Sequence, residues 1–357
     1  MAEADSQPLP EELSDADIGA AEEAAREVAK ILPSIDNAKI LRGETYIYHS
    51  PIPKSIQEDP EGEVILGVDE AGRGPVLGPM VYAVAYCLKS DSPMLQEHKF
   101  DGSSSPPPRS QNQPTNPNPP TDSKKLTHTF RTNLLQTLTT PDTTLHRDLG
   151  WSTNSLSPRD ISSGMLRSTT SSSTYNLNAQ AFDATTTLIT AVLASGVNVR
   201  EIYVDTVGPA TTYQSKLKKL FPSIAITVSK KADSIYPIVS AASVCAKVTR
   251  DAAIGVLMPE GEEIGSGYPG DEKTKGWLKR GMEPVFGWEV SMARFSWATA
   301  KDMLEGGGKN SGGGKGGGVE VVWPVEEDDG EQTLTGLWGA AAGGEGSRGV
   351  VGRHLKA

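Results

Sequence analysis

Two carboxylates stand together where an apolar run gives way to glycines. Residues 64–68 have the character of a buried strand, Asp69 and Glu70 follow them, and residues 72–75 contain two glycines and a proline. Side chains next to each other in a regular strand point to opposite faces, so both carboxylates can serve one site only if the strand ends or bends there. An isolated Asp-Glu pair is usually a solvated strand end, but the Gly-Arg-Gly turn that follows favours a functional role.

Two further carboxylates stand in comparable places. Asp205 ends the apolar run at residues 202–204, and Asp251 lies in a predicted long helix. Hard cations such as Mg²⁺ prefer oxygen ligands, and a pair of ions roughly 3.5–4 Å apart stabilises both the attacking and the leaving oxygen of phosphodiester cleavage. The five histidines are scattered and suggest no acid/base pair. The residues therefore favour metal-dependent chemistry on a nucleic acid.

Polar residues on the predicted helix also form a pattern. Ser240, Ser243, Lys247 and Asp251 follow one another at spacings of three, four and four, so they share one helix face. Such a stripe could hold phosphates and one metal ion. The alternative is a solvated face with an ion pair between Lys247 and Asp251, and the helix taken alone favours that alternative.

Other residues offer contacts to a nucleic acid. Gly72 and Gly74 let the backbone on either side of Arg73 approach a sugar or phosphate closely, and the guanidinium can grip a phosphate with two hydrogen bonds. Tyr268 could stack on a sugar or base, and Lys124 could add a phosphate contact. A lone tyrosine more often covers the edge of a core, so this alternative stays open.

Composition limits the kind of protein. The chain has 357 residues, 37% of them hydrophobic, a formal net charge of -11 and two cysteines. The negative charge argues against binding nucleic acid by bulk electrostatics, so a local basic patch would be needed. Two cysteines favour a reducing compartment over a disulfide framework. No apolar run is long enough to span a membrane and the N-terminus is acidic, so we expect a soluble intracellular protein.

The chain divides by composition into three parts. Residues 1–60 are acidic and expected to be a disordered tail, residues 61–305 form the catalytic domain, and residues 306–357 are a glycine-rich linker and tail. A low-complexity loop is inserted at residues 101–121. The pattern predicts strands at residues 64–69, 79–87, 202–205 and 224–228, and helices at 126–138, 176–194, 213–220, 235–257, 274–280 and 294–305. Strands and helices alternate, which indicates an α/β fold.

Five blocks of sequence resemble one family. They are residues 67–79, 122–124, 203–208, 240–251 and 265–269. Together they resemble the catalytic subunit of eukaryotic type 2 ribonuclease H, in the ribonuclease HII family, over about residues 63–305. The insert and the glycine-rich linker depart from that pattern.

The resemblance implies a fold and an activity. The fold would be a ribonuclease-H-like mixed sheet flanked by helices, with a C-terminal helical extension. The activity would be hydrolysis of RNA in RNA/DNA hybrids and incision on the 5′ side of single ribonucleotides in duplex DNA, with two Mg²⁺ or Mn²⁺ ions, leaving 5′-phosphate and 3′-hydroxyl ends. It also implies a heterotrimer with two non-catalytic subunits, and a nuclear role in ribonucleotide and RNA primer removal.

The resemblance also assigns roles to residues. Asp69, Glu70, Asp205 and Asp251 would be the catalytic carboxylates that bind metal. Gly72, Arg73 and Gly74 would read the 2′-hydroxyl, and Tyr268 would pack on the sugar at the junction of ribose and deoxyribose.

Two other functions remain open from the sequence. One is a catalytically silent scaffold that holds hybrids without cutting them, which the complete set of carboxylates disfavours. The other is an integrase-like strand transferase on a similar fold, which a turn suited to sensing ribose disfavours.

Overall fold

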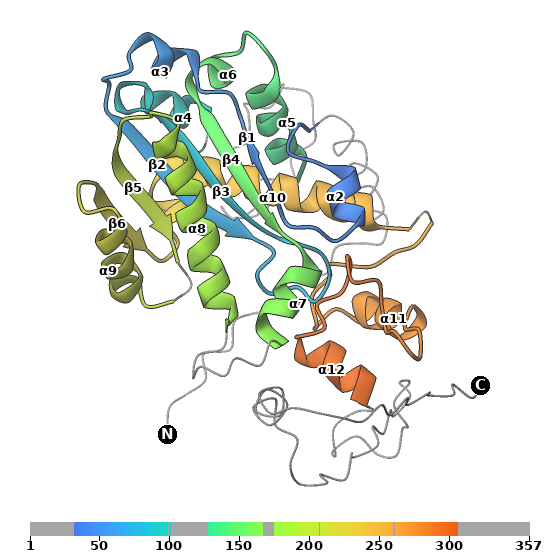
Figure 1. Ribbon diagram of the computed structural model, residues 1–357. Helices are drawn as coiled ribbons and strands as arrows, with labels where there is room; N and C mark the ends of the chain where they lie inside the picture. Colours follow the sequence, from blue (N-terminus) through green and yellow to red (C-terminus); the bar gives the residue numbers. More distant parts are fainter. Residues whose placement is uncertain are drawn as a thin grey trace, which may run out of the picture. The chain divides into compact units, whose positions relative to one another are not determined.

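A six-stranded mixed sheet forms the framework of the structure (Figure 1). The computed structural model describes residues 32–98, 100, 128–166, 175–206, 208–259 and 261–305. The strands are β1 (Tyr46–His49), β2 (Val64–Ala71), β3 (Met80–Leu88), β4 (Gly150–Leu156), β5 (Val199–Asp205) and β6 (Ala225–Ser229). The expected α/β fold with a mixed sheet is confirmed.

The order of the strands places β2 between strands of both directions. The order is β1-β4-β3-β2-β5-β6. β2 pairs with β3 antiparallel and with β5 in parallel. Because parallel strands end at the same edge of a sheet, the last residues of β2 and β5 lie side by side.

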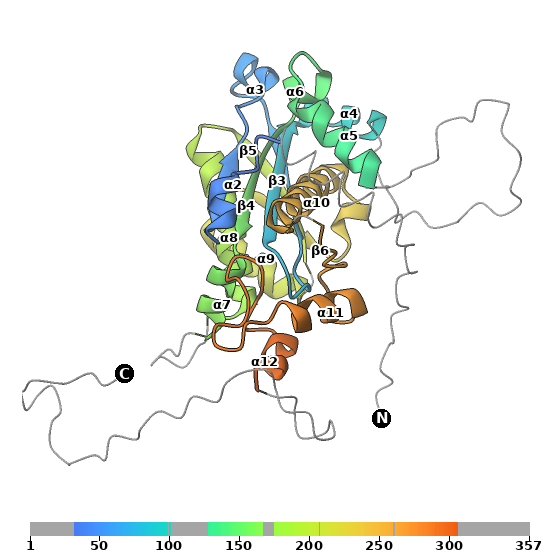
Figure 2. The same cartoon turned by 90° about the vertical axis from the view of Figure 1, so that its right-hand side faces the viewer.

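Helices cover both faces of the sheet. Figures 1 and 2 show α10 (Pro237–Leu257) across one face and α8 (Leu177–Ala194) on the other. Small and β-branched apolar residues dominate α10, so it packs closely on β2 and β3. The remaining helices are α2 (Asn37–Leu41), α3 (Lys54–Glu58), α4 (Pro93–Glu97), α5 (His128–Thr139), α6 (Thr144–Asp148), α7 (Pro158–Leu166), α9 (Ala210–Leu220), α11 (Glu272–Arg280) and α12 (Ala298–Glu305), with 3₁₀ turns at Lys89–Asp91 and Ala232–Ser234.

The segment before β2 is ordered from residue 32, so the prediction of a tail up to residue 60 is wrong for residues 32–60. That segment forms α2, β1 and α3, and its Leu32, Ile40, Tyr46 and Ile56 are buried. These four residues are too widely spaced in the sequence to form the apolar stripe of one helix, which is why the segment resembled a tail. Each of them nevertheless packs into the core. Residues 1–31 lie outside the described part, as do the insert at 101–121 and residues 306–357.

Several elements differ from the predicted pattern, and α4, α6 and α7 were not predicted. β4 was not predicted, because its central side chains are Ser152, Thr153, Asn154 and Ser155, which are buried between β1 and β3 although they are polar. α12 begins at Ala298 rather than at residue 294.

The C-terminal extension rests on the segment that follows β2. α11 and α12 share an apolar cluster with Val76 and Leu77, and Leu77 forms a β-bridge with Ala293. The extension therefore fixes the chain just beyond the carboxylates of β2. Among the described residues, no helix has the length and apolar character needed to cross a lipid bilayer.

Gly67 allows β2 and α10 to approach each other closely. A Cβ atom at this position would lie 2.4 Å from the Ile238 carbonyl oxygen and 2.6 Å from the Val239 nitrogen. Both atoms belong to the backbone, so they cannot rotate away. Only glycine fits where the strand meets the first turn of this helix.

We predict that Gly67→Ala destabilises the protein by about 1–3 kcal/mol, the usual cost of forcing an extra methyl group into a packed core. Urea denaturation measures the change. Gly270→Ala is the matched control, because an added Cβ atom there meets nothing within 4 Å. Equal stability of the two variants would contradict the close approach.

Candidate active site

Asp69 and Asp205 occupy matching positions at the ends of parallel strands. The last residues that β2 and β5 pair are Val68 and Val204, and each aspartate is the next residue of its strand. Side chains at one register of parallel strands point to the same face, here the face covered by α10. The sheet topology alone therefore brings these two carboxylates together.

Glu70 points to the other face of the sheet. β2 continues to Ala71, and Glu70 stands opposite Tyr82 of β3. The expectation that the strand ends at the carboxylates is wrong, because β3 goes on pairing with β2 through Ala71. The charge of Glu70 nevertheless interacts with those of Asp69 and Asp205 through the edge of the sheet.

Burial keeps the carboxylates of β2 partly protonated. Asp69 is only 5% exposed, and burial raises its pKa to about 7, while the nearby Ser243 hydroxyl and the charge of Lys247 oppose the rise. Burial and the charge of Asp69 raise the pKa of Glu70 to about 8. Ionising both carboxyl groups in the folded protein therefore costs free energy.

Asp205 is held by the backbone of the next segment. Its carboxylate accepts a hydrogen bond of 2.9 Å from the N–H of Ala232. Burial raises the pKa of Asp205 as well, and this hydrogen bond opposes the rise. Its orientation is therefore set independently of a ligand.

The polar stripe of α10 faces the sheet in its first half. Ser240 and Ser243 are 6% and 4% exposed, and Lys247 and Asp251 are half-buried. Asp251 forms an ion pair of 3.2 Å with Arg250, the residue before it. These burials do not fit the alternative of a solvated helix face. Asp251 lies one helical turn beyond Lys247, the residue whose charge acts on Asp69.

The glycine turn, Gly72–Gly74, is held through its carbonyl groups. Gly72 has a φ of +79°, which a residue with a side chain rarely adopts. Arg294 donates from Nη2 to the Gly72 oxygen at 2.6 Å and from Nη1 to the Arg73 oxygen at 3.1 Å. Trp297 donates from Nε1 to the Gly74 oxygen at 2.9 Å. Three consecutive carbonyl groups are thus bound from one side.

Arg294 is a site residue that the sequence did not indicate. Its side chain is fully buried, and burial lowers its pKa to about 9. Nε donates to the Gly78 oxygen at 2.9 Å, and the guanidinium lies 4.7 Å from the centre of the Trp297 ring. A single arginine inside a predicted helix gives no sign that it will reach back to a turn more than two hundred residues earlier.

The side chain of Arg73 is already engaged. Its guanidinium donates to the Tyr82 hydroxyl at 3.4 Å and to the Asn178 side-chain oxygen. Its charge also lowers the pKa of Glu70. Arg73 therefore lies on the α8 face, beside Glu70.

Tyr268 lies beside Gly74, the last residue of the glycine turn. It is 49% exposed, and a Cβ atom added at Gly74 would lie 3.1 Å from its ring. Its half-exposed ring is available to a ligand beside the turn, which does not fit the alternative that it merely covers the core. Lys124 lies outside the described residues.

The charges of Asp69, Glu70 and Asp205 interact, but these carboxylates do not form a finished metal site. Among the described residues, no three Asp, Glu, His or Cys side chains lie close enough to share a metal ion. The chemistry of the group nevertheless suits a hard cation, because the donors are carboxylate oxygens whose pKa values are raised by burial and by one another's charge, and a cation would offset both effects.

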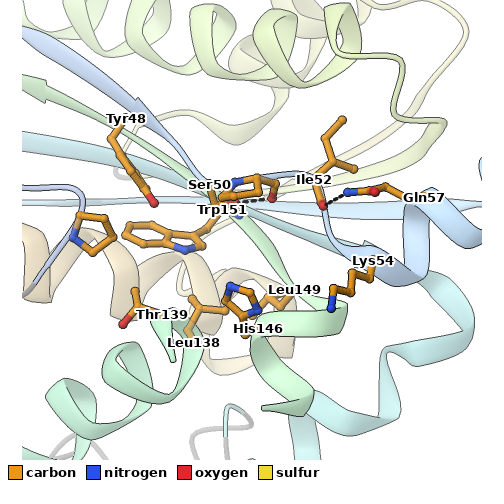
Figure 3. Close-up of a pocket in the computed structure, with 12 residues that line it drawn as sticks. Tyr48, Ser50, Ile52, Lys54, Gln57, Leu138, Thr139, His146, Leu149 and Trp151 are labelled. Atoms are coloured by element: carbon orange, nitrogen blue, oxygen red, sulfur yellow. Dashed lines mark hydrogen bonds between the residues drawn. The ribbon is translucent and has the colours of Figure 1, made fainter. Parts of the chain in front are cut away.

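A separate cavity of about 210 Å³ lies between β1, β4, α3, α5 and α6 (Figure 3). Tyr48 and Trp151 form one wall, with ring centres 4.9 Å apart, and Lys54 and His146 line the other side. None of the four carboxylates lines it. The cavity is therefore no part of the carboxylate site.

The raised pKa values predict how the stability of the metal-free protein depends on pH. Between about pH 4 and pH 8 the folded state holds protons on Asp69 and Glu70 that the unfolded chain releases. The contribution of these two groups to the stability of the fold is therefore full below about pH 4 and is lost as the pH rises to about 8. We expect the Asp69→Asn/Glu70→Gln variant to gain stability over the natural chain as the pH rises from about 5 to about 8.

Urea midpoints measured with chelator across this range test the prediction. Adding Mg²⁺ should stabilise the natural chain more than the variant, because only the natural chain has both carboxylates. If the urea midpoints of the two proteins changed in parallel with pH, the predicted effect of the two carboxylates would be contradicted.

Comparisons with known proteins identify the family of the chain. The family model of ribonuclease HII matches residues 66–105 and 120–300. The A subunit of ribonuclease H2 from Neurospora crassa is 48% identical over 306 residues, covering 85% of this chain and 86% of that protein. The Homo sapiens protein of the same name is 43% identical over 262 residues, covering 72% and 77%.

A solved structure has the same fold. The crystal structure of ribonuclease H2 from Pyrococcus horikoshii matches with a TM-score of 0.50 and 29% identity, and the match covers 67% of this chain and 96% of that one. The chain therefore belongs to the ribonuclease HII family, and its activity is that of a ribonuclease H, which hydrolyses RNA in RNA/DNA hybrids.

Proposed function

We propose that this ribonuclease H also incises duplex DNA on the 5′ side of a single ribonucleotide, and that it uses two divalent ions bound by Asp69, Glu70, Asp205 and Asp251. The observation that carries the proposal is the glycine turn, which is held rigidly one residue beyond the strand that bears Asp69 and Glu70. A carboxylate site beside a fixed backbone turn can combine cleavage with recognition of the sugar.

The turn is suited to detecting a 2′-hydroxyl. Its three carbonyl groups are occupied by Arg294 and Trp297, while its N–H groups donate to no other group in the part of the chain that the structure describes. Successive free N–H groups form a concave site for an oxygen atom. Gly74 is exposed, so such an oxygen can reach it.

Tyr268 supports the same assignment. Its half-exposed ring lies beside Gly74 and offers a flat surface for the sugar next to the one that the turn holds. A deoxyribose packs there without a polar conflict. The enzyme would thus recognise a ribose at the glycine turn and accept a deoxyribose at Tyr268.

The carboxylates have the chemistry that divalent ions require. Asp69 and Asp205 would bind from the α10 face, with Glu70 and Asp251 completing the set. Bound Mg²⁺ or Mn²⁺ supplies an activated water and neutralises charge that develops on the phosphate. The charge of Lys247 and the hydroxyl of Ser243 both lower the pKa of Asp69 and so favour its ionised, cation-binding form. The products would carry 5′-phosphate and 3′-hydroxyl ends.

We also propose that the chain works with partner subunits in the nucleus. The relatives from Neurospora crassa and Homo sapiens are both named as one lettered subunit of ribonuclease H2, which suits a heterotrimer with two non-catalytic subunits. The net charge of -11 supports this, because an acidic chain gains from partners that add basic surface for the duplex.

Cleavage of a duplex with one ribonucleotide tests the proposed function. In Mg²⁺ the complete enzyme should cut this duplex on the 5′ side of the ribonucleotide and leave the all-DNA duplex intact. Asp69→Asn and Asp205→Asn should each lower kcat by about 10²–10³-fold, as the loss of one group that stabilises the transition state does.

Asp302→Asn is the matched control, since Asp302 is exposed on α12 and should leave kcat unchanged. Full activity in both site variants, or equal cutting of the all-DNA duplex, would refute the assignment.

Arg294→Lys tests the support of the turn. Lysine keeps the charge but cannot donate to three carbonyl groups at once, so the turn should lose its fixed geometry. We expect kcat/KM for the single-ribonucleotide duplex to fall by about 10–100-fold, the usual cost of removing an orienting partner.

Arg159→Lys is the control, because Arg159 lies exposed on α7. An Arg294→Lys enzyme with normal kcat/KM on that duplex would show that the turn does not need this side chain.

A further inference from the structure

The side chain of Arg250 lies where three parts of the site meet. Its Nη1 donates to Asp251 Oδ1 at 3.2 Å. A Cβ atom at Gly72 would lie 3.2 Å from its Cγ and 3.3 Å from its Nε, and one at Gly267 would lie 3.4 Å from its Nη2. Arg250 thus touches a catalytic carboxylate, the glycine turn and the loop that carries Tyr268.

Two of its donors are buried without an acceptor. Among the described residues, no group accepts a hydrogen bond from Nε or Nη2, although the side chain as a whole is only 13% exposed. A buried charged donor without an acceptor is unfavourable and needs an explanation, which is often functional. The carbonyl oxygens of Pro79 and Leu77 border the same two glycine positions, so acceptors stand nearby.

The surroundings of Arg250 show that it does more than neutralise Asp251. The charge of Arg131, on α5, also acts on Asp251, so a second cation is present. The charge of Arg250 lowers the pKa of Arg294, which places both guanidinium groups near the same turn. Arg294 binds the carbonyl groups of the turn, while Arg250 packs against Gly72 and reaches Asp251.

We propose that Arg250 is a positioning residue that sets Asp251 and the glycine turn relative to each other, so that ion binding and ribonucleotide recognition depend on one side chain. The inference rests on the proposed function of the site. Arg250 does not have to touch the substrate, because its free donors are buried. It acts through the two elements that it joins.

Two substitutions separate its two contacts. Arg250→Met keeps the aliphatic stem against Gly72 and removes the charge beside Asp251. Arg250→Lys keeps a cation that can reach Asp251 but loses the planar group that lies between Gly72 and Gly267. Arg147→Lys serves as the control, since Arg147 forms an exposed ion pair with Glu58.

The experiment uses the complete enzyme and three readouts. Binding of Mn²⁺ is measured by electron paramagnetic resonance without substrate, and kcat and KM are measured on the single-ribonucleotide duplex and on an RNA/DNA hybrid. Arg250→Met should weaken Mn²⁺ binding and lower kcat on both substrates by about 10–100-fold, with KM nearly unchanged.

Arg250→Lys should bind Mn²⁺ almost normally and lose more activity on the single-ribonucleotide duplex than on the hybrid. Unchanged Mn²⁺ binding in Arg250→Met, or equal losses on both substrates in Arg250→Lys, would overturn the inference. If Arg250→Met does not fold, the substrate ratio of Arg250→Lys still decides it. A natural enzyme that fails to cut the single-ribonucleotide duplex would instead refute the proposed function, and the Mn²⁺ readout would still test Arg250.

Discussion

Repulsion between carboxylates at the ends of β2 and β5 is the constraint on which the rest of the site depends. The parallel register puts Asp69 beside Asp205, and Glu70 adds its charge through the edge of the sheet. Burial makes this repulsion costly, as the pKa values near 7 and 8 indicate. Such an arrangement suits the binding of a cation, because charges that repel one another all attract the ion.

The second requirement of the proposed function is a backbone turn that is held in place by the protein itself. Hydrogen bonds from Arg294 and Trp297 hold all three carbonyl groups of the glycine turn. Both residues come from the segment between α11 and α12, which is itself anchored on the residues that follow the turn. The C-terminal extension thus supports the turn, and in the function we propose a rigid turn provides selectivity without a dedicated side chain.

Local patterns predicted the elements that carry chemistry, and long-range contacts explain what they missed. The apolar runs of β2, β3 and β5 and the length of α10 are visible in the sequence, as are the four carboxylates. β4 was not predicted because its buried Ser, Thr and Asn residues are typical of a loop sequence. The face of Glu70 was misjudged because pairing with β3 continues past it. Arg294 could not be found, since its role depends on folding back onto Gly72 and Gly78.

A crystal of the complete enzyme with Mn²⁺ and a ribonucleotide-containing duplex that cannot be cut would test the central claim most directly. Anomalous scattering locates the manganese. The account predicts manganese peaks bound by Asp69 and Asp205 on the α10 face, with the 2′-hydroxyl of the ribonucleotide against the backbone N–H groups of Gly72–Gly74. Manganese bound elsewhere, or a duplex that avoids the glycine turn, would contradict it.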